Sequence, residues 1–382
     1  MRDSGRNRTG GVLALVIAFA AGGLLVFLPG QVPASTGPRT VATATPTPPT
    51  PLASVWPAAK IARYQGRLDD GTRFTPKLHL DLDTVVGTAP SADGSAIRVL
   101  LRRASGVTEL RRVARDVNPE IGAFTASGDA VVWGELTYPP GVDQPTQLWR
   151  LDWRTTDRPF LLTADGGYAV FYQTQFDIEI VDNIVYWVAN DFAAGLATTL
   201  VRSIPLAGGP VTIRRRELGT YALSTWPWLV TPYSGRQDPA KLVNIETDER
   251  RLVPHAPGEL IRCSPTWCRA GITGTMKLVR IDLVRPDGSG RRRIAGSEAT
   301  PILNDVALLD RFEVLVIDGD PSPGPGRPPG QRIVLYDINT KKTVLLDSGV
   351  AEAATGGGLL WWAIGAEASP TWRVLDLRDL PA

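Results

Sequence analysis

Short runs of alternating apolar and polar residues recur along most of the chain, separated by turn residues. The stretch 123–163 contains four such runs, at Ala123–Ala126, Ala130–Gly134, Gln147–Asp152 and Pro159–Leu162. Alternation of this kind is typical of β-strands, and the Ser, Gly and Asp residues between runs are typical of tight turns. Four short antiparallel strands form one propeller blade, which can bury its two faces only when neighbouring blades stack on it.

The same unit repeats along the rest of the chain. A Trp or Leu occurs in the second run of successive units, about 40–55 residues apart as in propeller blades, at Trp133, Trp187, Trp228, Trp267, Leu315 and Trp361. We expect the indoles to pack between blades. The pattern predicts an all-β fold, a seven-bladed β-propeller of four-stranded antiparallel blades, with six and eight blades as alternatives. The last unit ends after its third strand, so we expect Arg73–Leu80 to supply its missing outer strand.

The N-terminal part of the chain differs in composition from the repeats. A basic segment at 1–10 precedes an uncharged apolar segment at 11–28, and a Pro/Thr-rich linker at 29–59 leads to the propeller at 60–382. Segment 11–28 is just long enough for a transmembrane helix, and the basic residues before it place the N-terminus in the cytoplasm. It is either a single-pass anchor in the cell membrane or the signal sequence of a secreted protein. Both alternatives place the propeller outside the cytoplasm.

Composition and charge bear on the class of partner. The 382 residues carry a formal net charge of +2, too small to indicate a partner made of nucleic acid. Arginine clusters do occur at or beside the predicted fourth strands, where charge deters edge-to-edge pairing of sheets. The alternative is that they attract anionic envelope polymers or lipid headgroups. The clusters are Arg111-Arg112, Arg214–Arg216, Arg250-Arg251 and Arg291–Arg293.

Two segments that join a third to a fourth strand carry a family resemblance. They read LVRIDLVRPDGSGRRRIAG (278–296) and LWRLDWRTTDRPFLLTAD (148–165). These segments resemble the repeats of TolB-type and related WD40-like bacterial propellers, over about residues 80–382. The resemblance implies a propeller fold and an extracytoplasmic setting, and it implies no partner and no active residue.

The sequence contains no familiar catalytic or cofactor-binding motif, neither a nucleophile elbow nor a P-loop. His79 and His255 have no second His or Cys at ligand spacing, so we expect no metal site and no cofactor. Cys263 and Cys268 flank a predicted turn between two strands, and an extracytoplasmic domain is in an oxidising setting. We therefore expect a disulfide between them, with two buried thiols as the alternative.

The predicted blades have short turns after their first strands and long connections after their second strands. In a four-stranded antiparallel blade, these long connections and the blade-to-blade links emerge on the same face, around one mouth of the central channel. Their aromatic and polar residues suit recognition, although long loops also simply tolerate insertions. The candidate binding residues are Tyr138, Asp143, Asn190, Asp191, Phe192, Tyr233, Arg236 and Asp238.

These features favour a non-enzymatic, extracytoplasmic propeller that binds or scaffolds an unidentified protein or envelope polymer, without catalytic residues. The alternative is a propeller enzyme that acts on envelope carbohydrate through paired carboxylates. Such chemistry needs two Asp or Glu residues roughly 5–10 Å apart, a distance that spacing along the chain does not reveal.

Overall fold

The computed structural model describes residues 48–138, 144–191, 195–232, 239–274, 277–319 and 331–381. The predicted segments 1–10 and 11–28, and most of the linker 29–59, lie outside these ranges. In the part of the chain that is described, no helix has the length and hydropathy to cross a membrane. Regular structure there is nearly all β, accompanied by the four-residue helix α1 (Leu52–Val55) and a 3₁₀ turn at Arg115–Val117.

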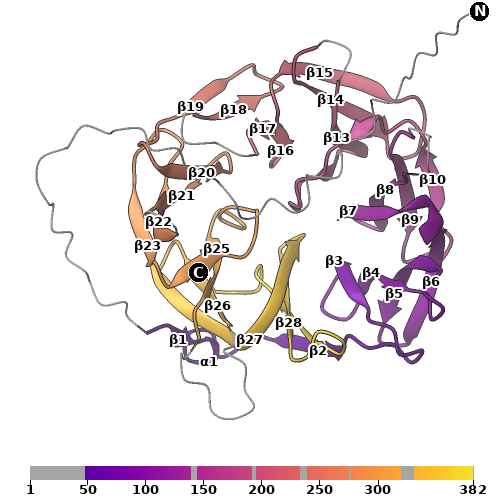
Figure 1. The fold of residues 1–382 in the computed structure, drawn as a ribbon, viewed down its shortest axis with the longest axis horizontal. Coiled ribbons are helices and arrows are strands. Elements are labelled where there is room, and N and C mark those ends of the chain that lie inside the picture. The colour runs from indigo at the N-terminus through magenta and orange to yellow at the C-terminus, as the bar shows by residue number, and fades with distance from the viewer. Residues whose placement is uncertain are drawn as a thin grey trace, which may run out of the picture. The chain divides into compact units, whose positions relative to one another are not determined.

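Most strands form four-stranded antiparallel sheets in which neighbours along the chain are neighbours in the sheet, as in propeller blades. Figure 1 shows the sheets following one another around a common centre, with β3, β7 and β16 inside and β6, β10 and β19 outside. The strands of these sheets are β3 (Thr75–His79), β4 (Val85–Pro90), β5 (Ala96–Arg103) and β6 (Gly106–Ala114); β7 (Glu120–Ser127), β8 (Ala130–Leu136), β9 (Gln147–Asp152) and β10 (Phe160–Thr163); β16 (Ala222–Leu223), β17 (Trp228–Val230), β18 (Ala240–Asn244) and β19 (Arg250–Val253); and β20 (Glu259–Cys263), β21 (Cys268–Thr273), β22 (Leu278–Val284) and β23 (Arg292–Gly296).

Two further sheets are larger variants of the same unit. In the first, two short strands pair with the same edge of one strand, and in the second, β27 serves both as the last strand of one unit and the first strand of the next. The five-stranded sheet contains β11 (Tyr168–Ala169), β12 (Ile178–Val181), β13 (Ile184–Asn190), β14 (Thr198–Pro205) and β15 (Thr212–Leu218). The eight-stranded sheet contains β1 (Thr50–Pro51), β2 (Ile61–Gln65), β24 (Ala299–Pro301), β25 (Phe312–Ile317), β26 (Gln331–Asp337), β27 (Lys342–Gly356), β28 (Leu359–Ile364) and β29 (Thr371–Asp376).

An N-terminal strand does complete the last unit, but the predicted segment was wrong. β2 pairs antiparallel with β29, in register from Ile61 opposite Leu375 to Gln65 opposite Thr371. The predicted segment, Arg73–Leu80, instead contains β3, the first strand of its own sheet. Sequence alternation did not reveal β2 because its residues are only partly buried or exposed, so its apolar face is weakly marked.

The core lies between successive sheets, where the second strands contribute their largest side chains. Trp133 and Trp187 are fully buried and Trp361 is 1% exposed, which matches the predicted packing of these indoles. Phe124 stacks on Trp133, with ring centroids 5.7 Å apart. The alternating pattern of the sequence therefore reports burial against a neighbouring sheet.

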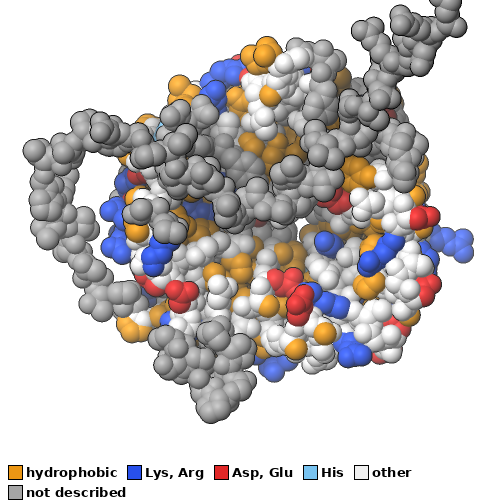
Figure 2. Space-filling model, viewed as in Figure 1, with side chains coloured by type: hydrophobic (Ala, Val, Ile, Leu, Met, Phe, Trp, Pro, Cys, Tyr) orange, Lys and Arg blue, Asp and Glu red, His pale blue; other side chains and the backbone are white. Residues whose placement is uncertain are grey.

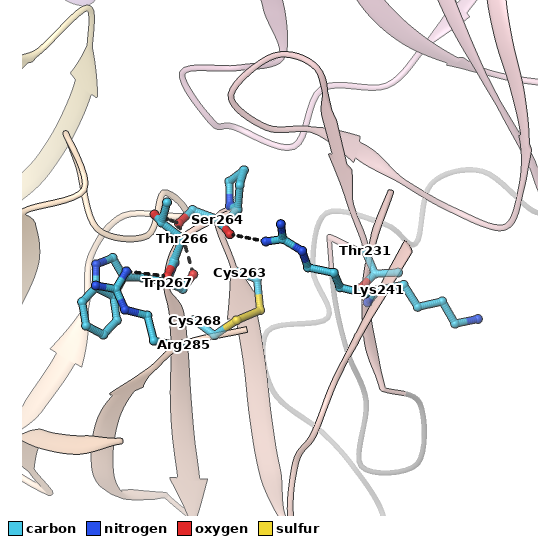
Figure 3. The surroundings of a disulfide bond; sticks show 10 residues. Thr231, Lys241, Cys263, Ser264, Thr266, Trp267, Cys268 and Arg285 are labelled. Carbon is cyan, nitrogen blue, oxygen red and sulfur yellow. Dashed lines mark hydrogen bonds between the residues drawn. A yellow bond between two sulfur atoms is a disulfide. The ribbon is translucent and has the colours of Figure 1, made fainter. Parts of the chain in front are cut away.

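The predicted disulfide between Cys263 and Cys268 is present. These residues are directly opposite each other at the end of the β20–β21 pair, with Cα atoms 4.0 Å apart. Figure 3 shows the disulfide beside the turn that carries Trp267, and Arg285 covers the Trp267 ring at 3.7 Å from its centroid. The disulfide therefore closes a turn whose Trp267 ring also contacts the Arg285 guanidinium.

Many arginines of the predicted clusters form ion pairs with carboxylates nearby. The Glu135 carboxylate accepts hydrogen bonds from Nε and Nη2 of Arg111, at 2.8 and 2.9 Å. The Glu217 carboxylate accepts hydrogen bonds from both terminal nitrogens of Arg250, at 2.6 and 3.0 Å. Such pairing reduces the positive charge that an anionic polymer would meet at the outer strands. Further pairs are Arg112–Glu109, Arg215–Asp248, Arg216–Asp191, Arg251–Glu249 and Arg291–Glu259.

Candidate functional site

Three of the eight predicted binding residues are in the described part of the chain. Tyr138 follows β8 and is 45% exposed, whereas Asn190 ends β13 and pairs with Tyr168 of β11. Asp191 forms an ion pair with Arg216 of β15. The other five residues lie outside the described ranges, so the binding face that they define stays a prediction; they are Asp143, Phe192, Tyr233, Arg236 and Asp238.

Charged side chains gather on three inner strands that are neighbours around the centre, β27, β3 and β7. Arg73, just before β3, forms an ion pair with Glu352 of β27. Lys77 of β3 interacts electrostatically with both Glu352 and Glu120, the first residue of β7. The hydroxyl of Tyr138 donates a hydrogen bond to Glu120. We call these five residues the inner-strand cluster.

The inner-strand cluster holds a partly desolvated cation between two carboxylates. Burial lowers the pKa of the Lys77 ammonium, and the negative charges of Glu120 and Glu352 act in the opposite direction. Burial raises the pKa of Tyr138, and the neighbouring Glu120 raises it further, so the phenol stays neutral and can donate. Figure 2 shows acidic and basic side chains next to each other near the centre of the face in view.

The inner-strand cluster lies at the end of the sheets from which the long connections emerge. Glu120 pairs with Leu136 at the end of β8, and Tyr168 pairs with Asn190 at the end of β13, so both belong to this end. Tyr168 is 47% exposed, close to the value for Tyr138. Carboxylates, a cation and exposed aromatic rings at one channel mouth are the side chains that a sugar-binding or sugar-cleaving site uses.

Two insertions in the inner strands of separate sheets meet each other. Residues 170–177 lie between β11 and β12, and residues 302–307 lie between β24 and the bridge of Leu308 to Phe312. The backbone N–H of Gln175 donates to the Asp305 carboxylate at 3.2 Å. The Asn304 side-chain amide donates to the Tyr172 carbonyl at 2.9 Å. We call this contact the channel bridge, because it joins inner strands that are distant in the chain.

A buried carboxylate holds one arm of the channel bridge. Asp177 is 3% exposed and accepts hydrogen bonds from the backbone N–H groups of Tyr172 (2.8 Å), Gln173 (2.7 Å) and Thr174 (3.3 Å). Burial raises the pKa of Asp177 to about 7, while these hydrogen bonds act against the rise. Its carboxyl oxygens are already used within the loop, so Asp177 is a positioning residue.

Glu179 of β12 is a half-buried residue whose carboxyl group lacks full hydrogen bonding. Its Oε1 accepts from the Trp226 backbone N–H at 3.4 Å, and its buried Oε2 has no partner among the described residues. Burial raises the pKa of Glu179 to about 8, and the Trp226 hydrogen bond opposes this. Glu179 therefore binds a proton in the folded protein at pH values where it is ionised in the unfolded chain.

We expect Glu179→Gln to stabilise the protein at alkaline pH. Since the folded-state pKa is above the unfolded value of about 4.3, the favourable contribution of Glu179 is complete below that value and is lost as pH rises through about 8. At pH 9 the variant should exceed the wild type in free energy of unfolding by about 1–3 kcal/mol. Urea titrations from pH 4 to pH 9 measure the difference.

The matched control is Glu246→Gln, because Glu246 accepts a hydrogen bond from the other nitrogen of the same residue, Trp226 Nε1, at 3.0 Å and is exposed. It should leave the pH dependence of stability unchanged. Equal stability of the Glu179→Gln variant and the wild type at pH 9 would contradict the assignment of a neutral, buried Glu179.

Of the inner-strand cluster, sequence reasoning identified Tyr138 but none of the four charged residues. Lys77 and Glu120 are isolated charges in otherwise ordinary strand patterns, and Lys77 was assigned to an outer strand of a different blade. The only signal in the sequence is a charged residue within or at the start of an innermost strand. In the described residues, no group of three or more His, Cys, Asp or Glu is placed to hold a metal ion.

No family model and no curated protein matches this chain. Solved structures that are similar in fold include an oligogalacturonate lyase from Vibrio parahaemolyticus (9% identity, 83% of this chain and 98% of that chain, TM-score 0.46). A puromycin-hydrolysing peptidase from Mycobacterium tuberculosis is also similar (15% identity, 87% of this chain and 53% of that chain, TM-score 0.46). A third is a putative TolB from Agrobacterium tumefaciens (16% identity, 63% of this chain and 84% of that chain, TM-score 0.38).

These comparisons bear on two predictions in opposite ways. TolB proteins and a β-propeller domain are among the similar structures, so the fold-level resemblance to TolB-like propellers is confirmed. The prediction of a non-enzymatic protein is corrected, because most of the similar structures are enzymes. The absence of a sequence motif does not exclude an active site, since residues that are distant in the chain can assemble one. At this level of identity the likeness is one of fold, and no activity is transferred from it.

Proposed function

We propose that the protein is an extracytoplasmic propeller enzyme that cleaves envelope carbohydrate through paired carboxylates, Glu120 and Glu352. The observation that supports this proposal best is the position of Lys77, which interacts with both glutamates from a strand between theirs. Glycoside hydrolysis requires a proton donor and a nucleophile or base on the two sides of the scissile bond. The proposal rests on the residues of this chain.

The partners of each glutamate suggest its role. The carboxylate of Glu352 is held in an ion pair by Arg73, so we assign it the part of nucleophile or base. Glu120 is exposed to solvent, so we assign it the part of the acid, which takes up a proton from water and passes it to the leaving oxygen; the Tyr138 hydroxyl holds its carboxyl group in place. The Lys77 ammonium would fix both carboxylates and offset the charge between them.

We infer that the ring has seven blades. The sheets β3–β6, β7–β10, β11–β15, β16–β19 and β20–β23 each count as one blade, and the eight-stranded sheet counts as two that share β27. We further propose that segment 11–28 anchors the chain in the membrane or directs its secretion, which would bring the channel mouth to envelope polymers.

The proposed activity predicts which substitutions abolish it. The purified full-length protein is incubated with separate polysaccharide fractions of a cell envelope, and newly formed reducing ends are measured. Glu120→Gln and Glu352→Gln should each lower the rate by about 100-fold or more, because acid–base and nucleophilic groups commonly contribute that much. Glu109→Gln is the matched control, since Glu109 also pairs with an arginine but lies on the outer strand β6.

Two results would reject the proposed function. One is a wild-type protein that releases no reducing ends from any fraction. The other is normal activity in both Glu120→Gln and Glu352→Gln, with folding checked by thermal unfolding.

A further inference from the structure

A pocket of about 240 Å³ lies at the tight-turn end of the sheets that supply the inner-strand cluster. It is formed by the ends of β3 and β7, the turn after β27 and residues that follow β9 and β29. We call it the tight-turn pocket. The side chains that matter for its chemistry are His79, Phe124, Trp153, Arg154, Gln175 and Arg378.

The tight-turn pocket is lined by two cationic side chains, each of which is paired with an aspartate outside the lining. Arg154 and Arg378 line it, whereas none of its described lining residues is Asp or Glu. The Asp129 carboxylate forms an ion pair with Arg154, with Nε at 3.0 Å. The Asp376 carboxylate accepts hydrogen bonds from Nε and Nη2 of Arg378, at 2.8 and 2.6 Å. A guanidinium has five N–H donors, so each arginine keeps donors beyond those ion pairs.

Aromatic side chains and tight-turn glycines form part of the remaining wall. Phe124 stacks on the buried Trp133, and Trp153 is 9% exposed. Gly128 and Gly357 have φ values of 57° and 59°, the left-handed region, and a Cβ on either would meet open space. The two glycines of these turns therefore place no side chain at the opening of the pocket.

Two neutral polar groups complete the lining. Gln175 is fixed by the channel bridge, where Asp305 accepts hydrogen bonds from its backbone and side chain. His79 is 2% exposed, its Nε2 is 3.1 Å from the Tyr64 hydroxyl, and burial lowers its pKa to about 3. The imidazole stays neutral, so the two arginines are the cationic side chains of the lining at any ordinary pH.

We propose that the tight-turn pocket binds a small organic or inorganic anion, a ligand that carries a carboxylate or a phosphate. Arginine donors are suited to the paired oxygens of such groups, and the aromatic walls accept the apolar part of an organic ligand. The site is separate from the inner-strand cluster, and its function does not depend on carbohydrate cleavage.

Isothermal titration calorimetry of the full-length protein tests the proposal with two probes, succinate and inorganic phosphate. Binding of at least one is expected, with affinity lowered about tenfold in Arg154→Gln and in Arg378→Gln, since each loses charge-assisted hydrogen bonds. A preference between the probes shows whether the natural ligand is a carboxylate or a phosphate. Glu120→Gln should bind as tightly as the wild type, which separates this result from the outcome of the cleavage assay.

The controls make the proposal falsifiable. Arg112→Gln removes an exposed arginine that also pairs with a carboxylate but lies on the outer strand β6, and it should leave binding unchanged. Uncharged 1,4-butanediol should not bind. The proposal is overturned if neither anion binds, if Arg112→Gln weakens binding as much as Arg154→Gln, or if butanediol binds as well as succinate. Arg154 is 62% exposed, so its variant should fold normally.

Discussion

Arg269→Met should lower the free energy of unfolding by about 3–5 kcal/mol, because it leaves an unpaired buried charge. Arg269 and Glu313 form an ion pair in which the side chains are 7% and 1% exposed. Arg269 also donates to the carbonyls of Leu303 (2.8 Å) and Asp305 (3.1 Å), and Glu313 accepts from the Ala307 N–H at 2.9 Å. The substitution therefore removes the support of one arm of the channel bridge. Urea denaturation of the wild type and variant measures the loss.

Two further variants separate pairing from burial. The double variant Arg269→Met/Glu313→Met should recover part of the loss, because it removes the orphaned carboxylate as well. Arg112→Met breaks an exposed ion pair with Glu109 and should cost less than about 1 kcal/mol. A loss for Arg269→Met no greater than for Arg112→Met would show that the buried pair does not stabilise the bridge.

Local pattern was enough to predict many of the strands and the disulfide. Alternation in Gln147–Asp152 reports burial of one face, and Trp133 and Trp187 fall at equivalent places in successive sheets. Cys263 and Cys268 could be paired because both flank one turn, so a hairpin alone brings them together. These features depend on residues that are close in sequence, which is the distance over which pattern is informative.

The inner-strand cluster and the channel bridge could not be predicted in this way. Glu352 meets Arg73 only because the last sheet closes beside the first, and Gln175 meets Asp305 only because two insertions point at each other. Both pairs join residues separated by long stretches of chain, and neither has a sequence motif. The strand that completes the last sheet also depends on how the two ends of the ring meet. Local pattern therefore predicts Arg73–Leu80 for that position, which β2 occupies.

Removing β2 should abolish the single cooperative unfolding transition of the domain. A chain that begins at Arg67 lacks the strand that covers the edge of β29, and it also lacks Tyr64, which packs against Phe74 of the next sheet at 6.4 Å between centroids. An open edge strand and an uncovered apolar face at the junction of first and last sheets would leave the ring unclosed and prone to aggregation. The comparison is a chain that begins at Lys60, which keeps β2 but loses the buried Trp56, so it should melt earlier yet cooperatively. Circular dichroism and calorimetry follow both chains; identical melting of the two would mean that pairing of β2 with β29 does not close the ring.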